Sequence, residues 1–550
     1  MSNKQTENKK QKQTAIAKQT TVITVLLSIV VVLFVVWIST KDMLKVVDTE
    51  PVQTDAELKY NEGDALGTND KFNVYEAIDT ANIKDITIKN DYGTYRVYRD
   101  KDGIPQISGY EGIAFHEESM SALMTSLGTP TAMYRVEYPD DLAQYGLAPR
   151  TLEDGTVKNP ASFEFVAELY NEETGKTEDV TYSGLVGDKT ITGGGYYFIY
   201  NGTPDVVYVI STAVEEAVLA PVETLVAPMI VAPMTDNDYY IVHDFILMKG
   251  EETIVHIDYI EEEERANSEL VTQTYRMLSH PDLIPAAEAV SAAIIGFHTA
   301  AQTDAMSTVE SALEVVHLGI EDEDLEKYNL GDNCYKLYYT YKGTENFLLI
   351  SPRNSDGSFY AASPLFCQIV KGGSDVFDFV TWDLFDWVEA PFFQMKINYI
   401  TDITVQSGDY NVTFDLTHVD AGVNSNGVDM GTDLDSVVER GTGKKMDVET
   451  FRQFYKTLLY ACYEGESGLM EDELESFQSS ADSEAQLILT IHTESGRELR
   501  YRFFRYTERK SYIELNGEGQ FYCLRTMADK ILADAKRVQN GDKIVSTDKY

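Results

Sequence analysis

Alternating apolar and polar residues recur at three places along the chain, at nearly even spacing. Segments with this alternation begin at Asp85, at Asp244 (159 positions later) and at Asp402 (a further 158 positions). In each segment the alternation runs on both sides of a Gly-containing turn, which is the pattern of a β-hairpin. The sequence therefore predicts three hairpins, each the start of one copy of a repeated unit.

A short helical landmark follows each hairpin. In each landmark a leucine precedes an aromatic residue by three positions, which places both side chains on one side of a helical turn. The three pairs are Leu142 with Tyr145, Leu325 with Tyr328, and Leu474 with Phe477. Gly146 and Asn329 then occupy the position at which a left-handed C-cap is expected.

Each unit continues with alternating strands and ends in an apolar stretch. The strands begin at Ser162, Cys334 and Leu487. We expect the closing stretches to be helices, and these cover residues 212–228, 375–391 and 524–538. The first two stretches end in Ala-Pro, and proline stops a helix and redirects the chain.

These landmarks predict an α+β fold of three repeated modules, each an antiparallel sheet covered by helices. Module 1 is expected over residues 81–236, module 2 over 237–399 and module 3 over 400–540, with a tail over 541–550. Module 2 has a longer gap between its landmarks. We assign the extra length to a helical insert at about residues 267–317.

The N-terminal region has a different pattern. Residues 21–39 form an uncharged, apolar run, and about 20 such residues cross a bilayer as a helix. Residues 1–20 carry five lysines against one glutamate, and basic segments stay in the cytoplasm. The sequence predicts a cytoplasmic tail over 1–20, a transmembrane signal anchor over 21–39 and an acidic stalk over 40–80. The expected localisation is the cell membrane, single-pass, with most of the chain extracytoplasmic.

The charge balance restricts the classes of partner. The 550 residues include 90 acidic and 45 basic side chains, which gives a formal net charge of −45. Nucleic-acid binding needs clustered Lys and Arg, so we expect no nucleic-acid partner. The hydrophobic content of 43% is sufficient for packed cores and excludes wholesale disorder.

The four cysteines contain no CxxC motif, which excludes a zinc knuckle and a thioredoxin-like site. We expect buried free thiols, with two disulfides as the alternative in an oxidising compartment. The cysteines are Cys334, Cys367, Cys462 and Cys523.

The first module resembles a known family. The matching motifs are Tyr145-Gly146-Leu147, Gly187-Asp188-Lys189-Thr190, Gly195-Tyr196-Tyr197 and Val207-Tyr208. They are similar to the pattern of the bacterial family called domain of unknown function 4340, clearly over about Asp85–Pro228 and more faintly in the later copies. The resemblance implies a membrane-anchored extracytoplasmic protein that often accompanies ABC-type export systems. The family has no established activity or catalytic residues to carry over.

The common catalytic motifs do not occur in the sequence, which contains no HExxH, GxSxG, SxxK or Walker A pattern. The glycines Gly193–Gly195 precede a strand, whereas phosphate-binding loops open a helix, so we expect a turn there. We therefore assign no catalytic, cofactor-binding or metal-binding residue and expect no cofactor.

Two further patterns have a structural and a functional interpretation. The segment Asp420–Asp435 has Asn424, Asn426 and Gly427 at calcium-loop spacing. Positions 1 and 12 of that loop would be Gly422 and Asp433, where an acidic residue and a glutamate are expected, so we expect a solvated loop. An aromatic stripe at helical spacing suggests carbohydrate binding or, as we expect, core packing. The stripe comprises Phe377, Phe379, Trp382, Phe385 and Trp387.

These observations predict a non-catalytic, membrane-anchored extracytoplasmic interaction protein, accessory to a cell-envelope or ABC-type transport assembly. The expected partners are the membrane, through residues 21–39, and an envelope protein such as an ABC-type permease. Two alternatives stay open: a module that binds cell-wall polymer or another ligand, and an envelope-acting hydrolase.

Overall fold

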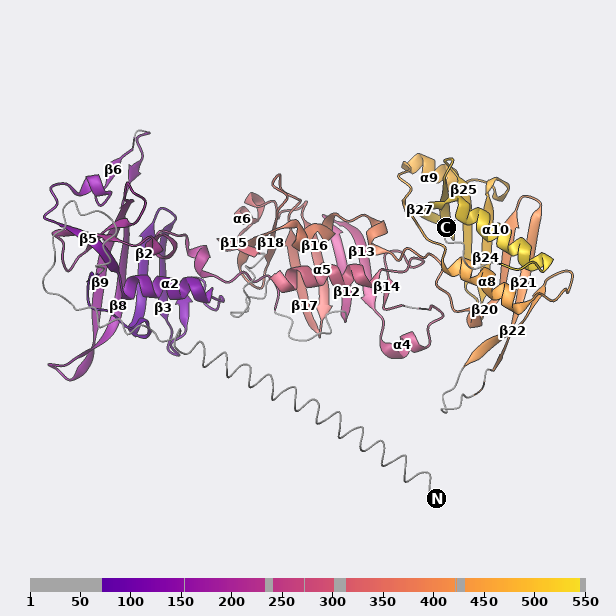
Figure 1. The fold of residues 1–550 in the computed structure, drawn as a ribbon, viewed down its shortest axis with the longest axis horizontal. Coiled ribbons are helices and arrows are strands. Elements are labelled where there is room, and N and C mark those ends of the chain that lie inside the picture. Colours follow the sequence, from indigo (N-terminus) through magenta and orange to yellow (C-terminus); the bar gives the residue numbers. More distant parts are fainter. Residues whose placement is uncertain are drawn as a thin grey trace, which may run out of the picture. The chain divides into compact units, whose positions relative to one another are not determined.

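The computed structural model describes residues 72–152, 154–232, 241–271, 273–300, 313–420, 422 and 431–544. The described part of the protein is mostly β, with 41% of the described residues in strands. The described strands form antiparallel sheets of nine, eight and eight strands and one two-stranded ribbon. This corrects the predicted α+β class, because the period-two pattern builds most of each module and leaves few residues for helices (Figure 1).

The membrane-spanning part of the predicted fold is also contradicted. None of the described helices is long and apolar enough to cross a membrane, which also overturns the predicted single-pass localisation. The longest of them, α10 (Arg525–Asn540), has 16 residues. At about 1.5 Å per residue it is shorter than the ~30 Å hydrocarbon core. The tail predicted over 1–20 and the span over 21–39 lie outside the described residues.

The nine-stranded sheet belongs to the first predicted module. From one edge to the other its strands are β4 (Pro105–Ile107), β3 (Gly93–Arg99), β2 (Ile83–Asn90), β8 (Ala161–Asn171), β9 (Lys176–Lys189), β10 (Tyr196–Tyr200), β11 (Val206–Ile210), β5 (Thr131–Glu137) and β1 (Phe72–Asn73). The separate ribbon pairs β6 (Arg150–Thr151) with β7 (Val157–Lys158).

The two eight-stranded sheets follow it in sequence. The second sheet runs β14 (Tyr275–Met277), β13 (Glu252–Tyr259), β12 (Val242–Lys249), β16 (Tyr335–Tyr341), β17 (Thr344–Ile350), β18 (Phe359–Ser363), β19 (Gln368–Gly372) and β15 (Leu313–Leu318). The third runs β22 (Thr432–Glu439), β21 (Tyr410–Asp420), β20 (Ile400–Ser407), β24 (Leu487–Thr493), β25 (Glu498–Arg505), β26 (Lys510–Leu515), β27 (Glu518–Leu524) and β23 (Gly465–Glu466).

All three sheets have one strand order. If the strands are counted from the first strand of each predicted hairpin, the order is 3-2-1-5-6-7-8-4 in every sheet, with β1 added beyond the fourth strand of the first. The predicted hairpins are confirmed as β2–β3, β12–β13 and β20–β21. Residues 267–317, expected to be an insert, contribute β14 and most of β15, and so form part of this shared order.

The chain divides into two compact units. One comprises Met1–Ser108 with Glu118–Pro221 and holds the first sheet. The other comprises Gly109–Glu117 with Val222–Tyr550 and holds the second and third sheets. The boundaries predicted for the three modules stay a prediction.

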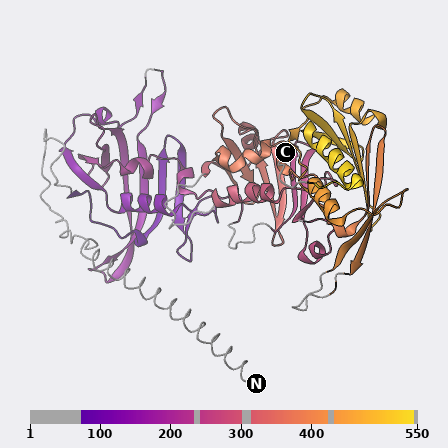
Figure 2. The same cartoon turned by 45° about the vertical axis from the view of Figure 1, so that its right-hand side comes forward.

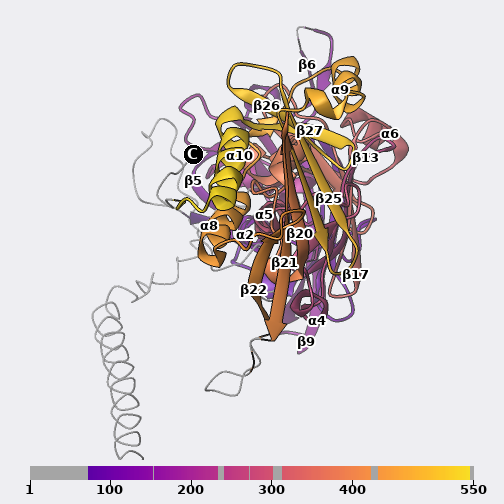
Figure 3. The same ribbon diagram turned by 90° about the vertical axis from the view of Figure 1, so that its right-hand side faces the viewer.

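A long helix precedes the fourth strand of each sheet. These helices are α2 (Glu117–Gly128), α5 (Ala287–Ala300) and α8 (Val448–Leu459). Helix α8 begins after Asp447, whose carboxylate accepts a hydrogen bond from the amide of Thr450 and so caps the helix. Its Phe451 packs on Phe414 of β21, with ring centroids 5.6 Å apart. Helix α10 lies beside α8 on the same face of the third sheet (Figures 2 and 3).

Of the three closing stretches, only the one over 524–538 is a long helix, α10, as predicted. The stretch over 212–228 forms α3 (Ala213–Ala217) and a 3-10 turn over Val222–Leu225, because Pro221 cannot continue a helix. The stretch over 375–391 forms α7 (Ser374–Phe377) and two 3-10 turns that are separated by extended backbone at Trp382. The long helices predicted for these two stretches are therefore wrong.

Each short helical landmark packs against its sheet through a pair of aromatic rings, one on the landmark and one on a strand. The landmarks are a 3-10 helix over Leu142–Tyr145, α6 (Asp322–Lys327) and α9 (Glu471–Gln478). The ring centroids are 4.9 Å apart for Tyr145 and Tyr197, 4.9 Å for Tyr328 and Tyr360, and 5.2 Å for Phe477 and Tyr512. The predicted left-handed positions are confirmed, with φ of 67° at Gly146 and 57° at Asn329.

The glycines in the family-like motif have a packing role. A Cβ atom on Gly187 would lie 2.2 Å from the carbonyl oxygen of Tyr145, so only glycine allows this turn to approach β9. Next to it, Asp188 accepts a hydrogen bond from Nη2 of Arg150 at 2.7 Å. The motif therefore holds the 142–147 turn and the β6–β7 ribbon against the first sheet.

We predict that Phe454→Ala destabilises the third sheet by about 3–5 kcal/mol, because it removes a fully buried ring of α8 from the core. Native-state hydrogen exchange of β20 measures this loss. The control is Tyr460→Ala, whose side chain is 67% exposed at the end of the same helix, with an expected change within about 0.5 kcal/mol. Equal protection of β20 in both variants would contradict the assigned core.

Candidate functional site

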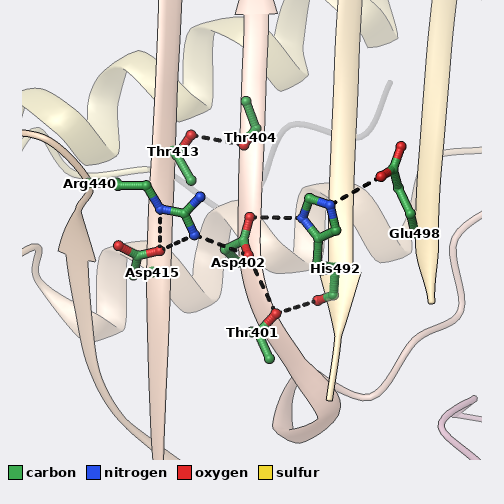
Figure 4. A network of polar contacts seen from close by, with 8 residues as sticks. All are labelled: Thr401, Asp402, Thr404, Thr413, Asp415, Arg440, His492 and Glu498. Carbon is green, nitrogen blue, oxygen red and sulfur yellow. Dashed lines mark hydrogen bonds and ion pairs between the residues drawn. The ribbon is translucent and has the colours of Figure 1, made fainter. Parts of the chain in front are cut away.

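The face of the third sheet opposite α8 carries a row of ionisable side chains, which we call the charged row. Asp415, Asp402, His492 and Glu498 are direct register partners on the adjacent strands β21, β20, β24 and β25. Successive residues of a strand point to opposite faces. Since Phe414 faces α8, its neighbour Asp415 and the rest of the row face away from the helix (Figure 4).

His492 lies between two carboxylates in this row. Its Nδ1 is 3.0 Å from Oδ1 of Asp402, and its Nε2 is 3.2 Å from Oε2 of Glu498. The hydrogen bond to Asp402 is the largest cause of a raised pKa of His492, and Glu498 adds to it. The pair of carboxylates therefore favours the imidazolium, in which both ring nitrogens donate.

Arg440 bridges the two aspartates of the row. Its Nε donates to Oδ1 of Asp415 at 2.8 Å, and its Nη2 lies 3.2 Å from Oδ2 of Asp402. The Asp402 side chain is only 10% exposed. A buried carboxylate needs charged or hydrogen-bonding partners, and Asp402 has a cation on each oxygen. The charged row is thus held together by one arginine and one histidine.

The ring nitrogens of His492 and the nearby hydroxyl groups all have hydrogen-bonding partners. An imidazolium that donates through both nitrogens has no lone pair for proton abstraction or metal binding. The hydroxyl of Thr401 lies 3.2 Å from the carbonyl oxygen of His492, to which it donates. The hydroxyls of Thr404 and Thr413 bond to each other at 2.9 Å. The charged row therefore places paired ionisable groups and hydroxyl groups on one face of the sheet.

The first and second sheets carry an aspartate at the position equivalent to Asp402. Nε of Arg96 donates to Asp85 at 2.9 Å, and Nε2 of His256 lies 3.4 Å from Oδ1 of Asp244. In all three sheets the pairing with the fifth strand shifts register at or beside this aspartate. Such irregularities change the direction in which nearby side chains point. Each sheet therefore presents one carboxylate next to a cation or a histidine.

The sequence signalled this site only in part. Asp85, Asp244 and Asp402 mark the starts of the three repeats, but the alternation by itself does not show their partners. Arg440 lies 38 positions after Asp402, directly after β22. His492 lies 90 positions after Asp402, in β24. The segment that contains His492 was predicted to be a strand because apolar and polar residues alternate along it. This alternation was the only sequence signal for the face of the sheet on which His492 lies.

The other sequence candidates have structural roles or lie outside the described residues. Asn424 and Asn426 of the possible calcium loop are outside them, whereas Asp433 pairs with Arg452. Within the described part of the chain, no group of three or more His, Cys, Asp or Glu side chains could hold a metal ion. In the aromatic stripe Phe377, Phe379 and Trp387 are buried, so core packing is confirmed for these three.

The four cysteines are all free in the structure. Cys334 and Cys523 are buried, as expected, and burial raises the pKa of both thiols. Cys367 is exposed and Cys462 is partly exposed, so the expectation of buried thiols is wrong for these two.

Comparison with models of known protein families and with curated proteins finds no match for this chain. The resemblance to the bacterial domain of unknown function 4340 therefore stays a prediction.

We predict that His492 titrates above about 6.5, its ordinary value, and that Asp402→Asn lowers its pKa. The stabilisation from this pair is fully present below about pH 6.5 and is lost as the pH rises through the raised pKa. NMR titration of the His492 ring, assigned with His492→Gln, measures both values.

The control is Asp415→Asn, which removes a carboxylate that bonds Arg440 but is not among the groups that raise the pKa of His492. We expect only a small change in the His492 titration. A wild-type value at or below 6.5, or equal shifts in the two variants, would show that Asp402 does not hold the imidazolium.

Proposed function

We propose that this chain is a non-catalytic interaction protein that binds a partner through the open faces of its sheets, meaning the faces opposite the long helices. The observation that carries the proposal is the state of His492, which is engaged by a carboxylate on each ring nitrogen. Carboxylates on both ring nitrogens raise the pKa of His492 and favour its charged form. The charged row is therefore suited to recognition.

The shared strand order supports the same proposal. Each sheet has a long helix on one face, and the short landmark helix packs over only part of the other (Figure 1). The fold therefore presents the same kind of surface three times, with different side chains in each copy. Arrays of related surfaces suit binding, although the fold alone does not determine a function.

The partner class follows from the sequence. The resemblance suggests an ABC-type transport assembly, and the net charge of −45 favours a partner with a basic surface. We therefore propose a protein component of such an assembly as the partner. Binding of cell-wall polymer is the alternative outcome of the experiment below.

Photo-crosslinking from the open faces tests the proposal. We expect full-length protein with benzoylphenylalanine at Thr490, on the open face of the third sheet, to crosslink in cells to one protein in high yield. The matched control is the same group at Ala533, an exposed position on α10. Mass spectrometry identifies the product.

A permease or ATPase captured from position 490 and not from 533 is the expected result. Equal capture from both positions would contradict binding through the open face. Capture of wall fragments would replace the protein partner by a polymer. Release of soluble wall fragments by wild-type protein, lost in His492→Gln, would show that the protein is a hydrolase.

A further inference from the structure

The open face of the second sheet differs from the other two in one row of side chains, which we call the platform row. On the strand that carries the repeated aspartate, this row lies two residues after the aspartate. The equivalent rows, in register across four adjacent strands, are Arg96, Thr87, Glu164 and Ser183 in the first sheet, and Thr413, Thr404, Thr490 and Arg500 in the third. In the second sheet the row is His256, Ile246, Tyr338 and Phe347.

The platform row of the second sheet is thus the one dominated by apolar side chains. Tyr338 and Phe347 stack on each other with ring centroids 4.5 Å apart and an interplanar angle of 18°. Their chain neighbours Leu337 and Leu348 are fully buried on the helix-covered face, so the aromatic pair is not needed for that core. Tyr338 remains 38% exposed.

The next row adds two apolar side chains, one on each side of a lysine. Met248, Lys336 and Leu349 form the next row in register, and Leu349 packs against the cluster of Leu330, Ala362 and Ile369 beside α6. The strip therefore runs from Ile246 and Tyr338 to the edge of the region that α6 covers. An apolar strip of this kind on a charged protein marks an interaction surface.

Carboxylates border the strip on the opposite side. Glu345 pairs in register with Thr340, two residues beyond Tyr338, and is exposed. Asp244, at the repeated aspartate position, has a side chain that is 64% exposed. An apolar strip beside exposed carboxylates matches a segment that has apolar residues on one side and Lys or Arg along the edge.

We infer that this open face of the second sheet binds a cationic amphipathic segment of a protein partner. The apolar side of the segment covers Ile246, Tyr338 and Phe347, and its basic residues reach Asp244 and Glu345. A second copy of this chain is disfavoured as the occupant, because each copy carries a net charge of −45. The inference rests on the proposed function, since it specifies which open face binds and the chemistry of its partner.

A model segment tests this surface directly. The probe is a fluorescein-labelled 18-residue peptide of Leu and Lys with leucines at helical spacing, titrated with full-length protein at physiological salt and read by fluorescence anisotropy. A peptide with Ser in place of Leu has the same charge and controls for non-specific attraction to an acidic protein. We expect the Leu-Lys peptide to bind at least ten times more tightly than the Ser-Lys peptide.

Variants locate the site. The double variant Tyr338→Ser with Phe347→Ser leaves the net charge unchanged and is expected to weaken binding of the Leu-Lys peptide at least tenfold. Thr490→Ser, at the equivalent position of the third sheet, is the matched control, with a change below twofold. Glu345→Gln combined with Asp244→Asn should weaken binding several-fold, whereas the conservative Phe347→Tyr keeps it. Circular dichroism verifies that each variant is folded.

Wild-type affinity in the double variant, or equal affinity for the two peptides, would overturn the inference. So would concentration-dependent dimers of wild-type protein that the double variant loses, because the occupant would then be a second copy. If the platform variants bind normally while position 490 still crosslinks to a transporter component, this inference fails and the proposed function stands. If the peptide binds as expected but position 490 captures no partner, the proposed function fails instead.

Discussion

The packing of one long helix on one face of an antiparallel sheet is the constraint on which the rest of this structure depends. In the third sheet this contact is made by rings such as Phe414 and Phe451, whose centroids are 5.6 Å apart. Because strands alternate with a period of two, burying one set of side chains fixes the other set on the opposite face. The open faces, and the charged and platform rows on them, are direct consequences of that contact.

The charged row shows how such a face can contain a nearly buried carboxylate. Asp402 is tolerated because Arg440 and His492 each bind one of its oxygens. Removal of either cation would leave a charge that water reaches poorly, which is much more costly than loss of an exposed ion pair. The same bonds engage both ring nitrogens of His492 and both carboxylate oxygens of Asp402.

The three sheets show how one framework presents different surfaces. Register partners at equivalent positions are polar in the first and third sheets, whereas the second places Ile246, Tyr338 and Phe347 there. Substitution on an open face costs little stability, because these positions are not part of the core under the helix. Surface chemistry can thus change between copies while the strand order remains the same, which is consistent with a binding role for the array.

The sequence by itself determined the features that local periodicity encodes. These are the three hairpins, the leucine–aromatic landmarks and the left-handed positions at Gly146 and Asn329. Only the tertiary structure decided which apolar stretches become helices: residues 375–391 fold as short turns around the buried Trp387, whereas 524–538 form α10. It also decided the partners of Asp402, because register between strands 90 positions apart depends on how whole sheets align. Periodicity is a property of neighbouring residues, whereas a site built across a sheet depends on strand pairing that no single segment contains.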